Sequence, residues 1–128
     1  MSGDGKLVLL VEDNEKNMKL ARDILRFKGY RVTEATTGED AVASAASEPP
    51  DLVLMDIQLP GIDGIEAFRR IRSDPKTAKV PVVALTASVM AGDRERFDKA
   101  GFDGFIAKPI DVKQFPDQVA SYLAKGRA

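Results

Sequence analysis

Short apolar runs alternate with amphipathic stretches along the whole chain. The first run, residues 7–11, is apolar at every position, which is typical of a strand covered on both faces. The residues after it follow a helical period, with apolar side chains at Met18, Ala21, Ile24 and Leu25. Asn14 can cap the start of this helix, and Gly29 can close its end. The chain therefore opens with a strand that leads into a helix.

The same couplet is expected five times. Strands are predicted at residues 7–11, 30–35, 51–56, 80–86 and 104–109, and helices at 14–29, 37–48, 64–74, 90–101 and 111–126. Strands and helices that alternate with short loops predict an α/β fold, in which a five-stranded parallel sheet has helices on both faces. We expect one domain over residues 1–128, with an ordered core at about 6–124 and no output domain after it.

The composition removes several classes of function. The 128 residues include no cysteine and no histidine, which excludes a disulfide framework, thiol chemistry, and the commonest general base and metal ligand. The formal net charge of -1 leaves no basic field for nucleic acid, so direct DNA binding is not expected. No apolar run has the length of a membrane span, and the first residues do not resemble a signal peptide. We expect a cytoplasmic protein.

The polar residues that end the predicted strands are the candidate site. In open parallel sheets, ligands bind beyond the carboxyl ends of the strands. The residues at these ends are Glu12, Asp13, Asp56, Thr86 and Lys108. Carboxylates that lie close together need a cation or a raised pKa, and oxygen ligands without histidine or cysteine favour Mg²⁺. Lys108 and Thr86 can hold the oxygens of an anion, so the pattern favours phosphoryl chemistry with Asp56 as the nucleophile.

Each of these residues alone has a simpler explanation. Asp56 could cap a loop or helix, and Glu12 and Asp13 could be acids of a first helical turn. Lys108 could be a solvated surface lysine, and Thr86 an ordinary β-branched strand residue. Their joint placement at strand ends favours the functional interpretation.

Four stretches of the chain, "VEDN", "DLVLMDIQLPGIDG", "PVVALTA" and "AKPI", carry a resemblance to a known family. In this order and spacing they resemble the receiver domain of the response-regulator family of two-component signalling. The resemblance covers nearly the whole sequence and is most similar to the DivK-type regulators and to receivers of hybrid kinases. It implies the flavodoxin-like doubly wound sheet, with strand order 2-1-3-4-5.

The resemblance also implies a role for each site residue. Asp56 matches the phospho-acceptor, and the implied Mg²⁺ ligands are Asp13, Asp56, Glu12 through water, and the backbone carbonyl of Gln58. Thr86 and Lys108 match the residues that bind the phosphoryl oxygens, and Phe105 matches an aromatic switch residue that moves with Thr86. Lys108 and Pro109 match a cis peptide bond of the family. Gln58 and Ser88 match positions that set the rate of dephosphorylation.

The implied partners are a sensor histidine kinase or histidine phosphotransferase and a downstream protein, because the donor histidine has to be external. A monomer or a weak, phosphorylation-linked dimer is expected. A phosphatase that uses an aspartyl-phosphate would generally need a second Asp at position 58, where this chain has Gln58. A flavin- or nucleotide-binding module would need a glycine-rich loop where this chain has acids. The remaining alternative is a pseudo-receiver that binds partners without taking phosphate.

Overall fold

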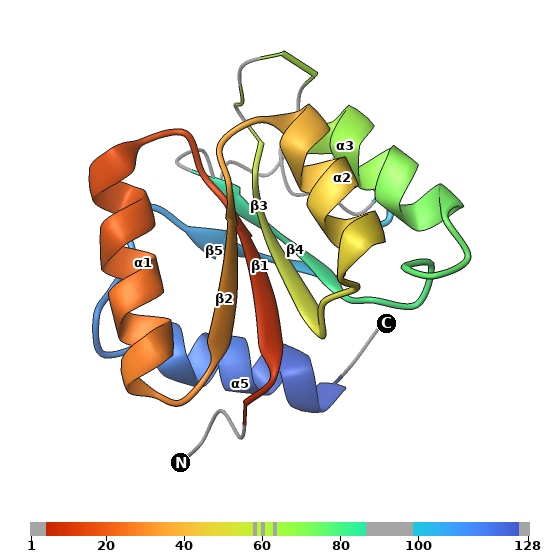
Figure 1. The fold of residues 1–128 in the computed structure, drawn as a ribbon. Helices are drawn as coiled ribbons and strands as arrows, with labels where there is room; N and C mark the ends of the chain where they lie inside the picture. The colour runs from red at the N-terminus through yellow and green to blue at the C-terminus, as the bar shows by residue number, and fades with distance from the viewer. Residues whose placement is uncertain (1–4, 58, 60, 63, 87–98, 126–128) are drawn as a thin grey trace.

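The computed structural model describes residues 5–57, 59, 61–62, 64–86 and 99–125, and its centre is a parallel sheet (Figure 1). The strands are β1 (Leu7–Val11), β2 (Arg31–Ala35), β3 (Leu52–Asp56), β4 (Val82–Thr86) and β5 (Gly104–Ala107). Their order across the sheet is β2-β1-β3-β4-β5, and every neighbouring pair is parallel. The flavodoxin-like doubly wound sheet expected from the sequence is therefore confirmed.

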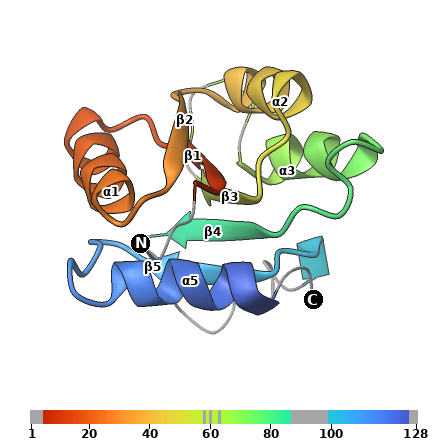
Figure 2. The ribbon, with the colours of Figure 1, turned by 60° about the horizontal axis from the view of Figure 1, so that its bottom comes forward.

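Helices cover both faces of this sheet (Figure 2). Four helices are described: α1 (Glu15–Phe27), α2 (Gly38–Ser47), α3 (Gly64–Ser73) and α5 (Phe115–Lys125). Helices α1 and α5 pack on one face, and α2 and α3 pack on the other. The fifth helix, expected over residues 90–101, lies mostly outside the described residues. Within the described residues, no helix combines the length and the apolar character that a bilayer crossing requires.

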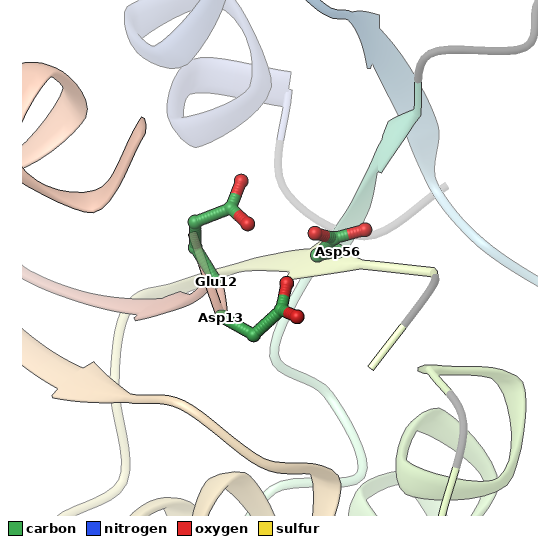
Figure 3. Close-up of side chains that lie close together, drawn as sticks. All are labelled: Glu12, Asp13 and Asp56. Atoms are coloured by element: carbon green, nitrogen blue, oxygen red, sulfur yellow. The ribbon is translucent and has the colours of Figure 1, made fainter. Parts of the chain in front are cut away.

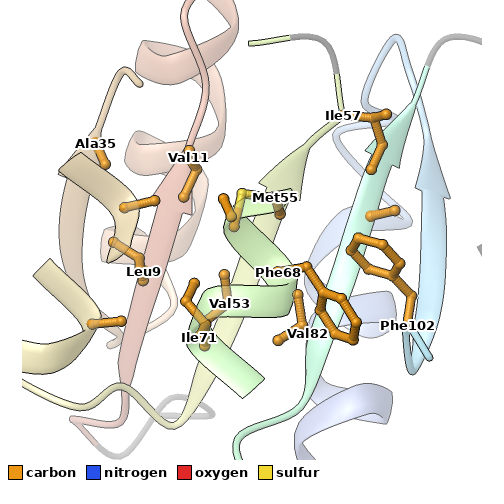
Figure 4. Packing of buried hydrophobic residues seen from close by; sticks show 14 residues of the cluster. Leu9, Val11, Ala35, Val53, Met55, Ile57, Phe68, Ile71, Val82 and Phe102 are labelled. Carbon is orange, nitrogen blue, oxygen red and sulfur yellow. The ribbon is translucent and has the colours of Figure 1, made fainter. Parts of the chain in front are cut away.

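The two hydrophobic clusters explain why a central strand such as β1 is apolar at every position. Alternate side chains of a strand point to opposite faces of the sheet. In β1, Leu9 and Val11 belong to the cluster beneath α2 and α3 (Figure 4), whereas Val8 and Leu10 belong to the cluster beneath α1 and α5. All residues of β1, β3 and β4 are buried, so these strands need apolar side chains on both faces.

The first helix begins and ends at the predicted signals. The side chain of Asn14 accepts a hydrogen bond from the backbone N–H of Asn17 at 3.0 Å, which satisfies one of the free amides of the first turn. Gly29 has a φ of 94°, a left-handed conformation that glycine adopts without the steric cost of a side chain. Both predictions for α1 are confirmed.

The last helix begins later than the sequence pattern predicts. A helix was expected from residue 111, but α5 begins at Phe115. The carboxylate of Asp111 accepts hydrogen bonds from the backbone N–H groups of Lys113, at 2.9 Å, and Gln114, at 3.0 Å. Aspartate commonly stabilises a turn in this way, so the segment before Phe115 is a turn rather than a helical extension.

Candidate functional site

Three carboxylates come together at the carboxyl edge of the sheet (Figure 3). Glu12 and Asp13 directly follow β1, and Asp56 is the last residue of the neighbouring strand β3. One carboxylate oxygen from each residue lies within 4.8 Å of the other two. The arrangement follows from the topology, because adjacent parallel strands end at the same edge.

Lys108 places its ammonium group between the two buried carboxylates. Its Nζ lies 2.8 Å from Oε1 of Glu12 and 2.9 Å from Oδ2 of Asp56. Glu12 is 2% exposed and Asp56 is 5% exposed, whereas Asp13 is exposed to solvent. The second oxygen of Glu12 accepts the backbone N–H of Asn14 at 3.0 Å. The loop after β5 thus brings a cation to acids on two other strands.

Burial and neighbouring charges shift the pKa values of Glu12 and Lys108. Burial raises the pKa of the Glu12 carboxyl above its usual value, and the neighbouring Asp56 carboxyl acts in the same direction. Burial by itself would lower the pKa of the Lys108 ammonium, but the contacts with Glu12 and Asp56 outweigh burial and raise this pKa. Lys108 is therefore a firmly charged cation that neutralises only part of the acidic cluster.

The donor set of the cluster fits Mg²⁺. In the part of the chain described here, the ligand atoms that converge are carboxylate oxygens of Glu12, Asp13 and Asp56. Mg²⁺ prefers hard oxygen ligands, keeps several waters and commonly takes one or two carboxylates. The exposed Asp13 leaves one side of the cluster open to solvent, from which water and an anion can complete the coordination of an ion.

Two further predicted residues lie on the neighbouring strands β4 and β5. Thr86 is the buried last residue of β4, and its backbone carbonyl accepts the N–H of Lys108 at 2.8 Å. Phe105 lies on β5 opposite Ala84, is partly buried, and packs against the cluster beneath α2 and α3. Phe105 is therefore an aromatic residue beside the hydrophobic core, and its role as a switch residue stays a prediction.

The remaining predicted features divide into one that the structure describes and two that it does not. The peptide bond between Lys108 and Pro109 is cis, as the family resemblance implied. Gln58, the source of the expected carbonyl ligand, and Ser88, the second expected determinant of dephosphorylation, lie outside the described residues. Their roles stay predictions.

Sequence reasoning missed the contacts that fix the loop after Asp56. Gly64, the first residue of α3, donates its N–H to the carbonyl of Ile57 at 3.1 Å. A Cβ atom at Gly64 would lie 2.5 Å from the carbonyl oxygen of Asp56, so only glycine permits this approach. Glu39 of α2 contacts the same loop through Ile62. In the sequence Glu39 resembles any acid in a first helical turn, so nothing in the pattern indicated the contact.

Comparisons with known proteins agree with this geometry. The model of the response regulator receiver domain family matches residues 8–120. The polar-differentiation response regulator DivK of Brucella ovis is 43% identical over 118 residues, which cover 92% of this chain and 96% of that protein. The chain therefore spans nearly the full length of this relative.

Solved structures show the same fold with similar sequences. The receiver domain of a sensor histidine kinase from Pseudomonas aeruginosa matches with a TM-score of 0.86 and 39% identity, covering 94% of this chain and 98% of that one. That structure has a magnesium ion coordinated in its active-site cleft. The receiver domain of a histidine kinase from Syntrophus aciditrophicus matches with a TM-score of 0.84 and 28% identity, covering 94% and 92% of the two chains.

The acidic cluster, the sheet order and the sequence matches point to the same assignment. A family match over residues 8–120 covers β1 to the middle of α5, and thus every strand that contributes to the site. We conclude that the chain belongs to the response regulator receiver family and is similar to its DivK members.

Proposed function

We propose that the protein accepts a phosphoryl group on Asp56 from a phosphohistidine of a sensor histidine kinase or histidine phosphotransferase. One observation carries the proposal. The buried Asp56 carboxylate ends β3 at 2.9 Å from the Lys108 ammonium and within 4.8 Å of the Glu12 and Asp13 carboxylates. The donor histidine belongs to the partner, because this chain contains none.

The proposed transfer forms one bond and breaks another. An oxygen of Asp56 attacks phosphorus as the bond between phosphorus and the donor imidazole nitrogen breaks, and the electron pair of that bond leaves with the imidazole. Lys108 is placed to follow the phosphoryl group, because its ammonium already contacts the acceptor carboxylate. Thr86, at the end of the next strand, is the proposed hydroxyl for a second phosphoryl oxygen.

Glu12, Asp13, Asp56 and the carbonyl of Gln58 are the proposed ligands of Mg²⁺. When bound, this ion supplies positive charge that offsets the repulsion between the acidic cluster and an incoming phosphoryl group. Glu12 and Asp56 are held by Lys108, so the chain itself orients two of the four ligands.

The proposed output is a contact with a downstream protein. Thr86 moves toward the phosphoryl group and Phe105 fills the space that it leaves, which changes the surface around β5 and α5. This change is a shift between two packings of one fold. The similarity to DivK supports a role as a response regulator. The proposed regulator is cytoplasmic, monomeric or weakly dimeric, and does not bind DNA directly. Its own chemistry is limited to self-phosphorylation and autodephosphorylation, whose rate Gln58 and Ser88 are proposed to set.

The test is incubation with acetyl phosphate and Mg²⁺, followed by intact mass measurement. The wild-type chain is expected to gain one phosphoryl group, and Asp56→Asn to gain none. Asp117→Asn makes the same chemical change at an exposed position of α5 and is expected to behave like the wild type. Omission of Mg²⁺ should abolish the adduct in the wild type and in Asp117→Asn.

The alternative, a pseudo-receiver that binds partners without phosphorylation, makes the opposite prediction. A folded wild-type chain that gains no mass with acetyl phosphate, and whose NMR spectrum does not change with beryllium fluoride and Mg²⁺, would refute the proposed transfer. Shifts at Thr86 and Phe105 upon addition of beryllium fluoride would support the proposed switch.

A further inference from the structure

We propose that Glu39, in the first turn of α2, is a positioning residue that holds the loop between β3 and α3 and thereby strengthens metal binding at the acidic cluster. The inference rests on the proposed function, because the loop begins at the phospho-acceptor. Among the described residues, the Glu39 carboxylate lies against Gly61 and Ile62 rather than against Glu12, Asp13 or Asp56, so its proposed effect passes through the loop.

Glu39 contacts the far end of the loop. Its Oε1 accepts the backbone N–H of Ile62 at 3.3 Å. The same carboxylate covers Gly61, because a Cβ atom at Gly61 would collide with Oε1 and lie 2.8 Å from Oε2. Gly61 has a φ of 77°, which also favours glycine. Glu39 therefore occupies the position that a side chain at Gly61 would need.

The backbone of α2 also approaches the loop, at the neighbouring residue Gly38. A Cβ atom at Gly38 would lie 2.5 Å from the carbonyl oxygen of Ile62. Gly38 is buried and follows Thr37, whose side chain caps α2 by accepting the N–H of Asp40 at 3.0 Å. A capped, buried helix end is a rigid support for the backbone that carries the exposed Glu39 side chain, so the acceptor of the Ile62 N–H comes from a fixed helix start.

Gly64 joins the end of the loop to the backbone of the acceptor strand. Gly64 closes the loop by bonding Ile57, and its Cα lies against the carbonyl of Asp56. Loss of the hydrogen bond to Ile62 would therefore loosen a loop whose ends, Ile57 and Gly64, are bonded to each other next to Asp56. Groups that ligate a metal bind best when their positions are fixed before binding, so a looser loop should lower the affinity for Mg²⁺.

The test compares Glu39→Ala, Glu39→Gln and Asp40→Ala with the wild type. Glutamine keeps an oxygen that can accept the Ile62 N–H but removes the charge. Asp40 is the next residue of the same turn and is exposed, so its variant controls for the loss of one acidic side chain from the helix start. Amide exchange of Ile62 is measured by NMR without metal, and Mg²⁺ affinity by titration.

Glu39→Ala should exchange the Ile62 amide faster and raise the Kd for Mg²⁺ by about 3-fold, the effect of one modest hydrogen bond. Glu39→Gln and Asp40→Ala should remain near the wild type in both measurements. Unchanged Ile62 exchange in Glu39→Ala would overturn the proposal. So would equal losses of affinity in Glu39→Ala and Glu39→Gln, or in Asp40→Ala, because charge would then be the cause.

Failure of the proposed function would look different from failure of this inference. If the wild type binds Mg²⁺ but gains no phosphoryl group, the transfer is refuted. Faster Ile62 exchange and weaker Mg²⁺ binding in Glu39→Ala would still show that Glu39 positions the loop.

Discussion

The two ends of the sheet each hold a partly buried cation, but the two cations have different numbers of acidic neighbours. At the carboxyl edge, Lys108 lies between Glu12 and Asp56, with Asp13 close by. At the opposite edge, the guanidinium of Arg72 lies 2.9 Å from Asp103, and their side chains are 14% and 3% exposed. One lysine thus faces several acids, whereas one arginine faces one acid.

The arginine pair is closed by further contacts. Arg72 donates to the backbone carbonyls of Ala78 and Val80, and Asp103 accepts the backbone N–H of Val82 at 2.8 Å. The guanidinium also lies over the ring of Phe68, 4.9 Å from its centroid. Buried charges are tolerated when they are paired and hydrogen-bonded, and this pair meets both conditions.

The stacked rings of Phe68 and Phe102 belong to the same end of the molecule (Figure 4). Their centroids are 4.2 Å apart, which adds packing beside the ion pair. The acidic cluster has an open, exposed side at Asp13 instead. An ion pair with matched charges is a structural connection, whereas under the proposed function the excess of acids at the other edge serves to bind a metal ion.

Breaking the ion pair between Arg72 and Asp103 should change the free energy of unfolding more than the other variants below. Asp103→Leu leaves the Arg72 charge buried without its carboxylate and should lower the free energy of unfolding by about 3 kcal/mol. Urea denaturation measures this loss. The double variant Arg72→Met with Asp103→Leu removes both charges and should lose less than the sum of the single variants. Additive losses would mean that the two residues do not act as a pair.

Mg²⁺ should stabilise the folded chain by binding at the acidic cluster and not at the Arg72–Asp103 pair. A free concentration ten times the Kd should raise the free energy of unfolding by about 1.4 kcal/mol, because the ion binds the folded chain. Thermal unfolding with and without a chelator measures the shift. Arg72→Lys should retain the shift and Asp13→Asn should lose most of it. An equal shift in Asp13→Asn would place the ion elsewhere.

The smallest effect is a gain in stability at the acidic cluster. Burial raises the pKa of Glu12, so the fold disfavours the ionised carboxylate. Glu12→Gln mimics the protonated form and should raise the free energy of unfolding by up to about 1 kcal/mol without metal, while it weakens Mg²⁺ binding. Chemical denaturation in chelator, together with Mg²⁺ titration, tests both signs. A loss of stability in chelator would show that the contact with Lys108 outweighs the burial of the charge.

The fold was predictable because each level of the sequence pattern agrees with the next. Fully apolar runs such as residues 7–11 belong to strands buried on both faces. Strands that alternate with helices through short loops predict a parallel sheet. The start of α5 was not predictable from periodicity, because the Asp111 side chain competes with the helix for the backbone amides.

The acidic cluster was predictable for a topological reason. Asp56 ends β3, Glu12 and Lys108 directly follow β1 and β5, and parallel strands bring such residues to one edge. Arg72 and Asp103 are 31 residues apart and end no strand, so they resemble surface charges in the sequence. Only the packing of α3 against the segment before β5 makes them partners. Contacts such as theirs, and that of Glu39, depend on tertiary distances that no spacing encodes.

The contact between Lys108 and Asp56 bears on when, during synthesis and folding, Asp56 could accept a phosphoryl group. These residues are 52 positions apart, and Lys108 follows the last strand of the sheet. A chain leaving the ribosome therefore presents Asp56 long before its counter-cation exists. Contacts of such long sequence separation are slow to form, because the intervening chain has to be ordered first. Under the proposed function, a nascent or partly folded copy cannot be phosphorylated. The phosphorylated population then contains only fully synthesised, folded molecules.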